Sequence, residues 1–194
     1  MGNIVIGNHA TWRSMIFMKV GDHAGEKWEQ ILARKRRELE TAGKIFWGYG
    51  GSACHPLTQV QPFARLSIEA GDVPVLVMQS VRSTMDEERY VAEEYSEDGV
   101  TWRRIPDGVR VTGSRYAIIL GEVTAGDFLF DPREFEVGIG PSRGKRANEY
   151  LVGRTDKGCL VRSDRPSLPV QDSSELTKIS HFGEMAAPYA VLLR

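Results

Sequence analysis

Residues 46–65 concentrate the side chains of this sequence that can do chemistry. They read FWGYGGSACHPLTQVQPFAR and combine aromatic rings, three glycines, a thiol, an imidazole and a guanidinium. A glycine backbone can turn sharply or approach a ligand closely, and aromatic rings offer flat faces for stacking. We therefore expect this segment to bind a planar or anionic ligand. The expected ligand-binding residues are Trp47, Gly48, Tyr49, Gly50, Gly51 and Arg65.

A basic loop at residues 140–146, GPSRGKR, is the second candidate for ligand binding. The backbone N–H groups and mobile cations of such a loop suit a phosphate group. Its expected ligand-binding residues are Arg143, Lys145 and Arg146. A solvated hairpin tip is the structural alternative, because exposed loops are commonly charged. The sequence leaves open whether this loop and the glycine-rich segment share one cleft.

Residues 48–53, GYGGSA, match the glycine spacing of dinucleotide-binding loops. That motif requires a strand before it and a helix after it, within a βαβ unit. Pro56 and Pro62 disfavour a helix here, so we expect no dinucleotide site. The alternative to any ligand site is a tight crossover that buries Trp47 and Phe63 in the core.

Cys54 and His55 together suggest a hydrolase or transferase, with Cys54 as nucleophile or His55 as acid and base. Adjacent residues of an extended segment point to opposite faces, so a base for Cys54 would come from His9, His23 or His181. The four histidines are scattered, and the chain has no Cys-x-x-Cys pair. We therefore expect no metal site.

These candidates are held by one early helix and many short strands. Residues 26–41 predict an amphipathic helix that Gly43 ends, with a solvent-facing pair between Arg34 and Glu38. Its apolar face consists of Trp28, Ile31, Leu32 and Leu39. Buried strands are expected at residues 15–20, 73–78, 116–120 and 190–193.

Turn signals predict antiparallel pairing. A hairpin at Asp98-Gly99 would place Tyr95 opposite Trp102, Glu94 opposite Arg103 and Glu93 opposite Arg104. Residues 83–86 also have the pattern of a capping box, so both strand and helix remain open for residues 84–95. Further turns at residues 113–114 and 156–158 would close two more hairpins, the first pairing Val111 with Tyr116.

The expected fold is α+β: an N-terminal amphipathic helix packed on a bent, mainly antiparallel sheet, with a barrel-like sheet as an alternative. The length of 194 residues predicts one domain over residues 1–194. Apolar and charged fractions of 41% and 26% disfavour a disordered or membrane protein, and no apolar run is long enough to span a bilayer. Cys54 and Cys159, in different sequence surroundings, are expected as reduced thiols in the cytoplasm.

The leading functional hypothesis is a binding module for a nucleotide-like or nucleic-acid ligand. In it, Trp47 or Tyr49 stacks on a base, and the arginines and lysine named above meet phosphate. The Cys54 and His55 enzyme is the alternative. A third interpretation is a protein-interaction domain or a homodimer built by edge-strand pairing. The sequence indicates no particular cofactor and no membrane partner.

Overall fold

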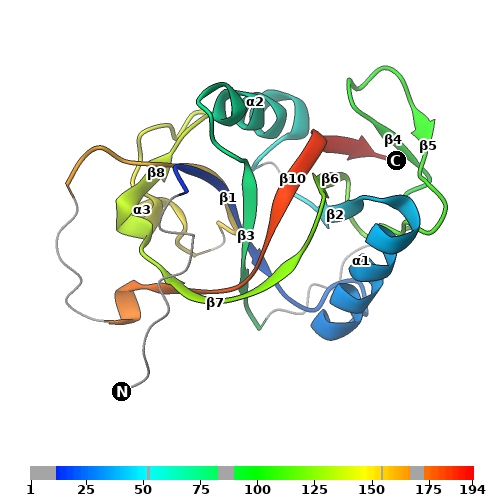
Figure 1. The fold of residues 1–194 in the computed structure, drawn as a ribbon, viewed down its shortest axis with the longest axis horizontal. Coiled ribbons are helices and arrows are strands. Elements are labelled where there is room, and N and C mark those ends of the chain that lie inside the picture. Colours follow the sequence, from blue (N-terminus) through cyan, green and yellow to red (C-terminus); the bar gives the residue numbers. More distant parts are fainter. Residues whose placement is uncertain (1–11, 52, 83–89, 154, 167–172) are drawn as a thin grey trace.

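The computed structural model describes residues 12–51, 53–82, 90–153, 155–166 and 173–194. The described chain is mixed α/β, with a large, mostly antiparallel sheet of ten strands (Figure 1). In chain order its elements are β1 (Ser14–Val20), α1 (Trp28–Ala42), β2 (Ile45–Tyr49), the π-helical η2 (Pro56–Val60), α2 (Gln61–Glu69), β3 (Val75–Ser80), β4 (Glu94–Ser96), β5 (Arg103–Arg104), β6 (Tyr116–Leu120), β7 (Thr124–Phe130), the 3-10 segment η3 (Pro132–Glu134), β8 (Phe135–Val137), α3 (Ala147–Tyr150), β9 (Lys157–Arg162), the 3-10 segment η4 (Ser173–Glu175) and β10 (Thr177–Leu193).

The main path of the sheet runs β2-β6-β10-β3-β1-β9-β8. The 17 residues of β10 pair with β3, β4, β6 and β7, and the pairing shifts between Ile179 and His181 and again between Met185 and Ala190. Among the described pairs, β1 and β3 are parallel and the others antiparallel. Within the described residues the path ends at β2 and β8, so the sheet is open and the barrel-like alternative is wrong.

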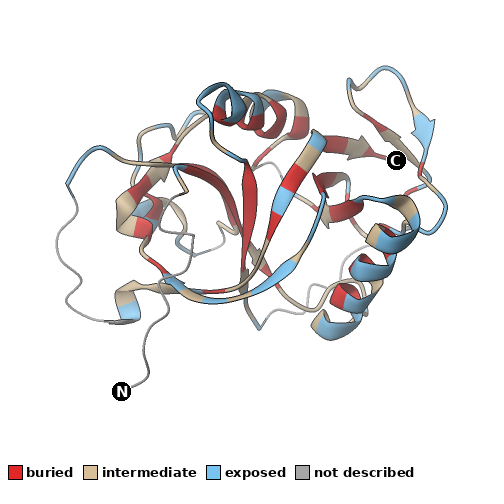
Figure 2. Cartoon of the chain, viewed as in Figure 1, coloured by how far each residue is buried: buried red, intermediate tan, exposed pale blue. Residues whose placement is uncertain are grey.

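The central strands consist mostly of buried residues, as Figure 2 shows for β1 and β3. Along β1, Ile16 and Met18 enter the core cluster that also contains residues of α1 and β2, whereas Met15 and Phe17 enter a second cluster on the opposite face. Strands that are covered on both sides read as continuous apolar runs, and for that reason these strands were predictable from the sequence.

The predicted helix at residues 26–41 is present as α1, and Gly43 ends it in the left-handed conformation with φ 69°. Its Ile31 and Leu32 belong to the same core cluster as Ile45 and Trp47. The described helices include none long and apolar enough to cross a membrane.

The expectation that Pro56 and Pro62 would prevent a helix is wrong. Pro56 opens η2 and Pro62 lies in the first turn of α2, where a helix needs no donor from that backbone nitrogen. The order strand, glycine loop, helix therefore exists here. However, β6 and β10 separate β2 from β3 in the sheet, so the unit is not a dinucleotide-binding βαβ unit.

The expected register of the Asp98 hairpin is wrong by one residue, because Glu94 pairs with Arg104 and Tyr95 with Arg103. The Asp98 carboxylate accepts hydrogen bonds from the backbone N–H groups of Thr101 and Val100 within this loop. These bonds, led by that from Thr101, hold the pKa of Asp98 well below its usual value. Residues 90–95 contain a bridge and part of β4 rather than a helix, and residues 84–89 lie outside the described residues.

The other two expected hairpins are also wrong. Thr112 bridges Val91, while Tyr116 pairs with Tyr49 and Leu192 instead of Val111. Residues 157 and 158 lie inside β9, where they pair with β1. In both places long-range strand pairing takes precedence over the local turn signal.

Candidate functional site

A pocket of about 790 Å³ lies where β1, β2 and α1 meet. Residues 18–23 form one wall, residues 47–51 a second, and one face of α1 a third. Parts of the segments 110–114 and 153–157 complete the lining. A concave site of this volume is typical of small-molecule binding.

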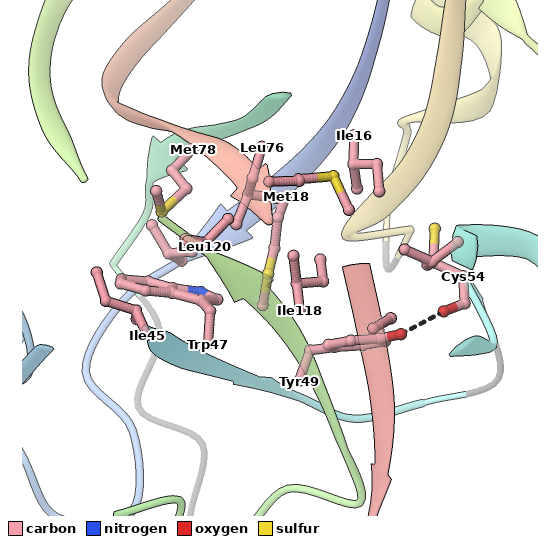
Figure 3. Close-up of a cluster of buried hydrophobic side chains, with 14 of the residues drawn as sticks. Ile16, Met18, Ile45, Trp47, Tyr49, Cys54, Leu76, Met78, Ile118 and Leu120 are labelled. Carbon is pink, nitrogen blue, oxygen red and sulfur yellow. Dashed lines mark hydrogen bonds between the residues drawn. The ribbon is translucent and has the colours of Figure 1, made fainter. Parts of the chain in front are cut away.

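The glycine-rich wall contains five of the six residues that the sequence suggested in this segment, namely Trp47, Gly48, Tyr49, Gly50 and Gly51. Trp47 and Tyr49 are 4% and 2% exposed, so neither ring is an open stacking platform. Figure 3 shows both rings among the core side chains, with the Tyr49 hydroxyl donating to the Cys54 carbonyl oxygen at 2.6 Å. The rings form the apolar floor of the pocket.

Trp28 extends this aromatic floor from α1. Its ring meets Trp47 edge to face, with centroids 5.7 Å apart, and meets His181 in the same way at 5.3 Å. Trp28 is half-buried and lines the pocket. It is therefore the tryptophan of this site that keeps an accessible surface for a ligand.

The glycines of the loop have different structural roles. A β-carbon on Gly48 would lie 2.7 Å from both Ser114 Oγ and Val111 Cγ1, so glycine is needed for this close approach. Gly51 has a φ of 83°, which disfavours other residues, whereas a β-carbon on Gly50 would meet nothing within 4 Å. The glycine pattern is thus largely explained by packing and backbone geometry.

Behind the pocket lies a buried ion network on α1. Glu38 is fully buried and accepts hydrogen bonds from Arg34 Nη1 at 3.0 Å, Lys35 Nζ at 2.9 Å and the Arg110 backbone N–H at 3.1 Å. Lys35 also donates to the carbonyl oxygen of Phe46. The expected pair between Arg34 and Glu38 is present, but the Glu38 carboxylate is buried rather than solvent-facing.

Burial lowers the pKa of Lys35 to about 8, and the attraction of Glu38 opposes that shift. Arg34 also donates to both oxygens of Glu26. In the network, then, each cation has a carboxylate partner. The charges of this network are therefore balanced without a ligand, and the network has a structural role.

Two other cations of the lining form no ion pair with a carboxylate among the described residues, although, after the hydrogen bond from Arg34, the charge of Arg110 helps to lower the pKa of Glu26. Lys19 Nζ donates to the carbonyl oxygens of Leu151 at 3.1 Å and Thr155 at 3.0 Å. The Arg110 residue is exposed, and its backbone, rather than its guanidinium, is held by the network. Within the described residues neither side chain forms an ion pair, whereas Lys157 pairs with Asp156 at 2.6 Å. The pocket lining therefore has an excess of positive charge.

Thr112 adds an unusual polar group to the lining. Its carbonyl oxygen lies 3.1 Å from His23 Nε2, while its buried Oγ1 has no hydrogen-bond partner among the described residues. Leaving a buried hydroxyl unsatisfied costs about 1–3 kcal/mol.

The basic loop does not line this pocket. A β-carbon on Gly140 would lie 2.7 Å from Gln59 Nε2, which places the loop beside η2. Arg146 donates to the backbone carbonyl oxygens of Arg133 and Arg165, and Arg143 and Lys145 are exposed. Arg65 is exposed on α2 and is likewise absent from the lining. The glycine-rich wall and the basic loop are thus separate features.

Cys54 and His55 are not arranged as a nucleophile and its base. The Cys54 sulfur lies 3.8 Å from the Cys159 sulfur, and the described residues place no imidazole in hydrogen-bond contact with it. His55 Nδ1 accepts from the Leu57 N–H at 3.3 Å and so caps η2. His9 lies outside the described residues. The described part of the chain also contains no group of three or more potential metal ligands among its His, Cys, Asp and Glu residues.

Sequence reasoning missed the parts of the lining that come from β1 and from residues 110–114, which include Lys19, Arg110 and Thr112. These residues have no motif, because they come from separate parts of the chain. Trp28 was identified only as part of the apolar face of a helix. The sequence signal that could have identified Trp28 was its position in the first turn of α1, before the charged residues of the same helix face.

Comparison of the chain with models of known protein families, with curated proteins and with solved structures finds no match. Function is therefore inferred from the pocket itself.

Proposed function

We propose that the pocket binds a small, nucleotide-like anion, with its flat apolar part against the aromatic floor and its charged part at the cationic rim. The observation that carries the proposal is the combination of Trp28 and Trp47 with Lys19 and Arg110, two cations without carboxylate partners among the described residues. Because burying apolar surface favours association and an anion restores charge balance, the two groups favour one bipartite ligand.

The volume of the pocket supports a mononucleotide or a ligand of similar size rather than a polymer. Pockets of about 300–1,000 Å³ enclose most of the surface of such a molecule. A nucleic acid would need exposed aromatic faces beside a continuous basic surface. Here Trp47 and Tyr49 are buried and the basic loop lies beside η2, so a nucleic-acid ligand has less support.

The test is calorimetric titration of the protein with AMP, GMP, adenosine and inorganic phosphate at low and moderate salt. We expect a nucleotide to bind more tightly than adenosine or phosphate alone, and its affinity to fall as salt screens the charges. Truncating Arg110 to alanine should weaken nucleotide binding about 10- to 100-fold, since a hydrogen bond to a charged group contributes about 1.5–3 kcal/mol.

Arg143→Ala is the matched control, because it removes an exposed arginine of the basic loop outside the pocket. Arg110→Ala keeps the backbone atoms that bond to Arg34 and Glu38, so it should leave the fold intact. Equal affinity in wild type and Arg110→Ala, together with loss in Arg143→Ala, would move the ligand to the basic loop. Absence of binding by every probe would refute the proposal.

A further inference from the structure

Two thiols that are distant in the sequence meet in the core. Cys54 and Cys159 are 105 residues apart in the chain, and their sulfur atoms lie 3.8 Å apart. Both cysteines are free thiols, and the two residues are 4% and 3% exposed. The sequence around the two cysteines differs, and only the fold brings their sulfur atoms together. A disulfide bond is about 2.05 Å long, so the two sulfur atoms must approach each other by a little under 2 Å for a bond to form.

The backbone of Cys54 is held in an uncommon conformation. Its φ of 59° lies in the left-handed region, which residues other than glycine rarely adopt. The hydrogen bond from the Tyr49 hydroxyl to the Cys54 carbonyl oxygen fixes this turn. Strained backbone of this kind persists where surrounding contacts enforce it, and it often marks a functional position. Here the enforced turn places the Cys54 sulfur beside Cys159.

We propose that Cys54 and Cys159 form an oxidation site that hydrogen peroxide converts, reversibly, into an intramolecular disulfide. This inference does not depend on the ligand of the pocket. A site built from two adjacent thiols differs from a lone reactive cysteine, because the second thiol resolves the first oxidation product before it is oxidised further.

The reaction balances with peroxide as the two-electron oxidant. The Cys54 sulfur, as thiolate, attacks one peroxide oxygen, the O–O bond breaks, and the released hydroxide takes up the thiol proton as water. This leaves a sulfenic acid on Cys54. The Cys159 sulfur then attacks the Cys54 sulfur, the S–O bond breaks, and hydroxide leaves with the Cys159 proton as a second water. A small dithiol reductant reverses the bond by thiol–disulfide exchange.

The order of attack follows from the contact between the thiols. Cys159 Sγ donates its hydrogen to Cys54 Sγ, and this hydrogen bond, together with burial, raises the pKa of Cys159 well above its usual value. Cys159 thus retains its proton and acts second. Burial of both residues also favours a small oxidant such as peroxide over a bulky alkylating reagent.

The disulfide would connect two walls of the pocket. Gly51 and Lys157 line the pocket, and Cys54 and Cys159 follow them closely in the chain. A bond between the cysteines would therefore tether the glycine-rich wall to β9. It would also close a long loop in the unfolded chain, which stabilises the folded state.

The experiment treats the reduced full-length protein with an equimolar amount of hydrogen peroxide, then alkylates it with iodoacetamide under denaturing conditions and measures the intact mass. We expect a monomer that has lost two hydrogen atoms, takes up no alkyl group, yields one peptide pair linking Cys54 to Cys159 and melts at a higher temperature. Dithiothreitol should restore two alkylatable thiols.

Two serine variants complete the test. Cys159→Ser should stop at a sulfenic acid on Cys54 that dimedone traps, whereas Cys54→Ser should leave Cys159 unmodified at the same peroxide dose. The proposal is overturned if wild type retains two alkylatable thiols, gains oxygen without losing hydrogen, or forms only intermolecular dimers. Since the wild-type measurement alone decides between these results, poor folding of a variant does not remove the test.

Discussion

The buried carboxylate of Glu38 holds α1, β2 and the segment around residue 110 together, and its replacement by glutamine isolates that role. Glutamine keeps the size of the side chain but removes the charge that balances the Lys35 ammonium. Its amide nitrogen would also meet donors from Arg34 and Arg110 where the carboxylate accepts hydrogen bonds. The perturbation is therefore electrostatic, with little change in volume.

The expected cost follows from the burial of both partners. Lys35 and Glu38 are 3% and 0% exposed, so water cannot replace the lost partner. Breaking a buried ion pair by removing one member typically costs about 3–5 kcal/mol of unfolding free energy. Lys35 can limit the cost by losing its proton, because burial already lowers its pKa to about 8. Without Glu38 that pKa should fall further, because the attraction of Glu38 opposes the lowering, so the destabilisation should shrink as the pH rises toward 8.

Urea denaturation at pH 7, followed by tryptophan fluorescence, measures the effect. Glu40→Gln is the matched control, because Glu40 is exposed on the same helix, and it should change stability by less than about 0.5 kcal/mol. Adding Lys35→Met to Glu38→Gln should recover part of the loss, since the unpaired charge is removed as well. Equal stability of the two glutamine variants, or strictly additive losses in the double variant, would refute the reasoning.

Two further predictions concern pH and the glycine-rich wall. The pKa of Lys35 is about 8 in the folded protein, and its ordinary value is 10.5, so between these values the unfolded chain binds more protons than the folded chain. The free energy of unfolding of the wild type should therefore rise with pH from about 8 to 9.5. In Lys35→Met, that part of the rise in the urea midpoint should be missing. Gly48→Ala should destabilise the protein by roughly 1–3 kcal/mol through overpacking against Ser114 and Val111, whereas Gly50→Ala should stay within about 0.5 kcal/mol; equal thermal melting of the two variants would contradict the packing argument.

The α1 network shows why part of the fold was predictable and part was not. Ile31 and Leu32 define the buried face by their spacing, and Lys35 and Glu38 continue the same face over the next two turns. A charged residue on a core-facing stripe indicates a buried ion, but the sequence does not show which groups satisfy it. Those groups include the Phe46 carbonyl and the Arg110 N–H, which become neighbours only through long-range strand pairing.

The turns failed for a related reason. A local turn signal describes the preference of four or five residues, and strand pairing can override it. Residues 157 and 158 have a turn composition, but they pair with β1 and cover its edge inside the sheet. The prolines failed differently, because Pro56 and Pro62 stand at helix beginnings, where proline is tolerated, rather than inside a helix.

The candidate site arises from the way the sheet brings β1 and β2 together. Four steps of the sheet path separate these strands, yet Met18 of β1 and Trp47 of β2 share one core cluster. Irregular pairing along β10, the strand between them, is the kind of feature that lets a sheet bend around its core. The pocket opens where this core ends, so its floor is aromatic and its rim carries the charges of the surrounding segments. A ligand should therefore enter with its apolar part first and keep its anionic part near Arg110, which makes the loss of affinity in Arg110→Ala depend on the ligand's charge rather than on its ring.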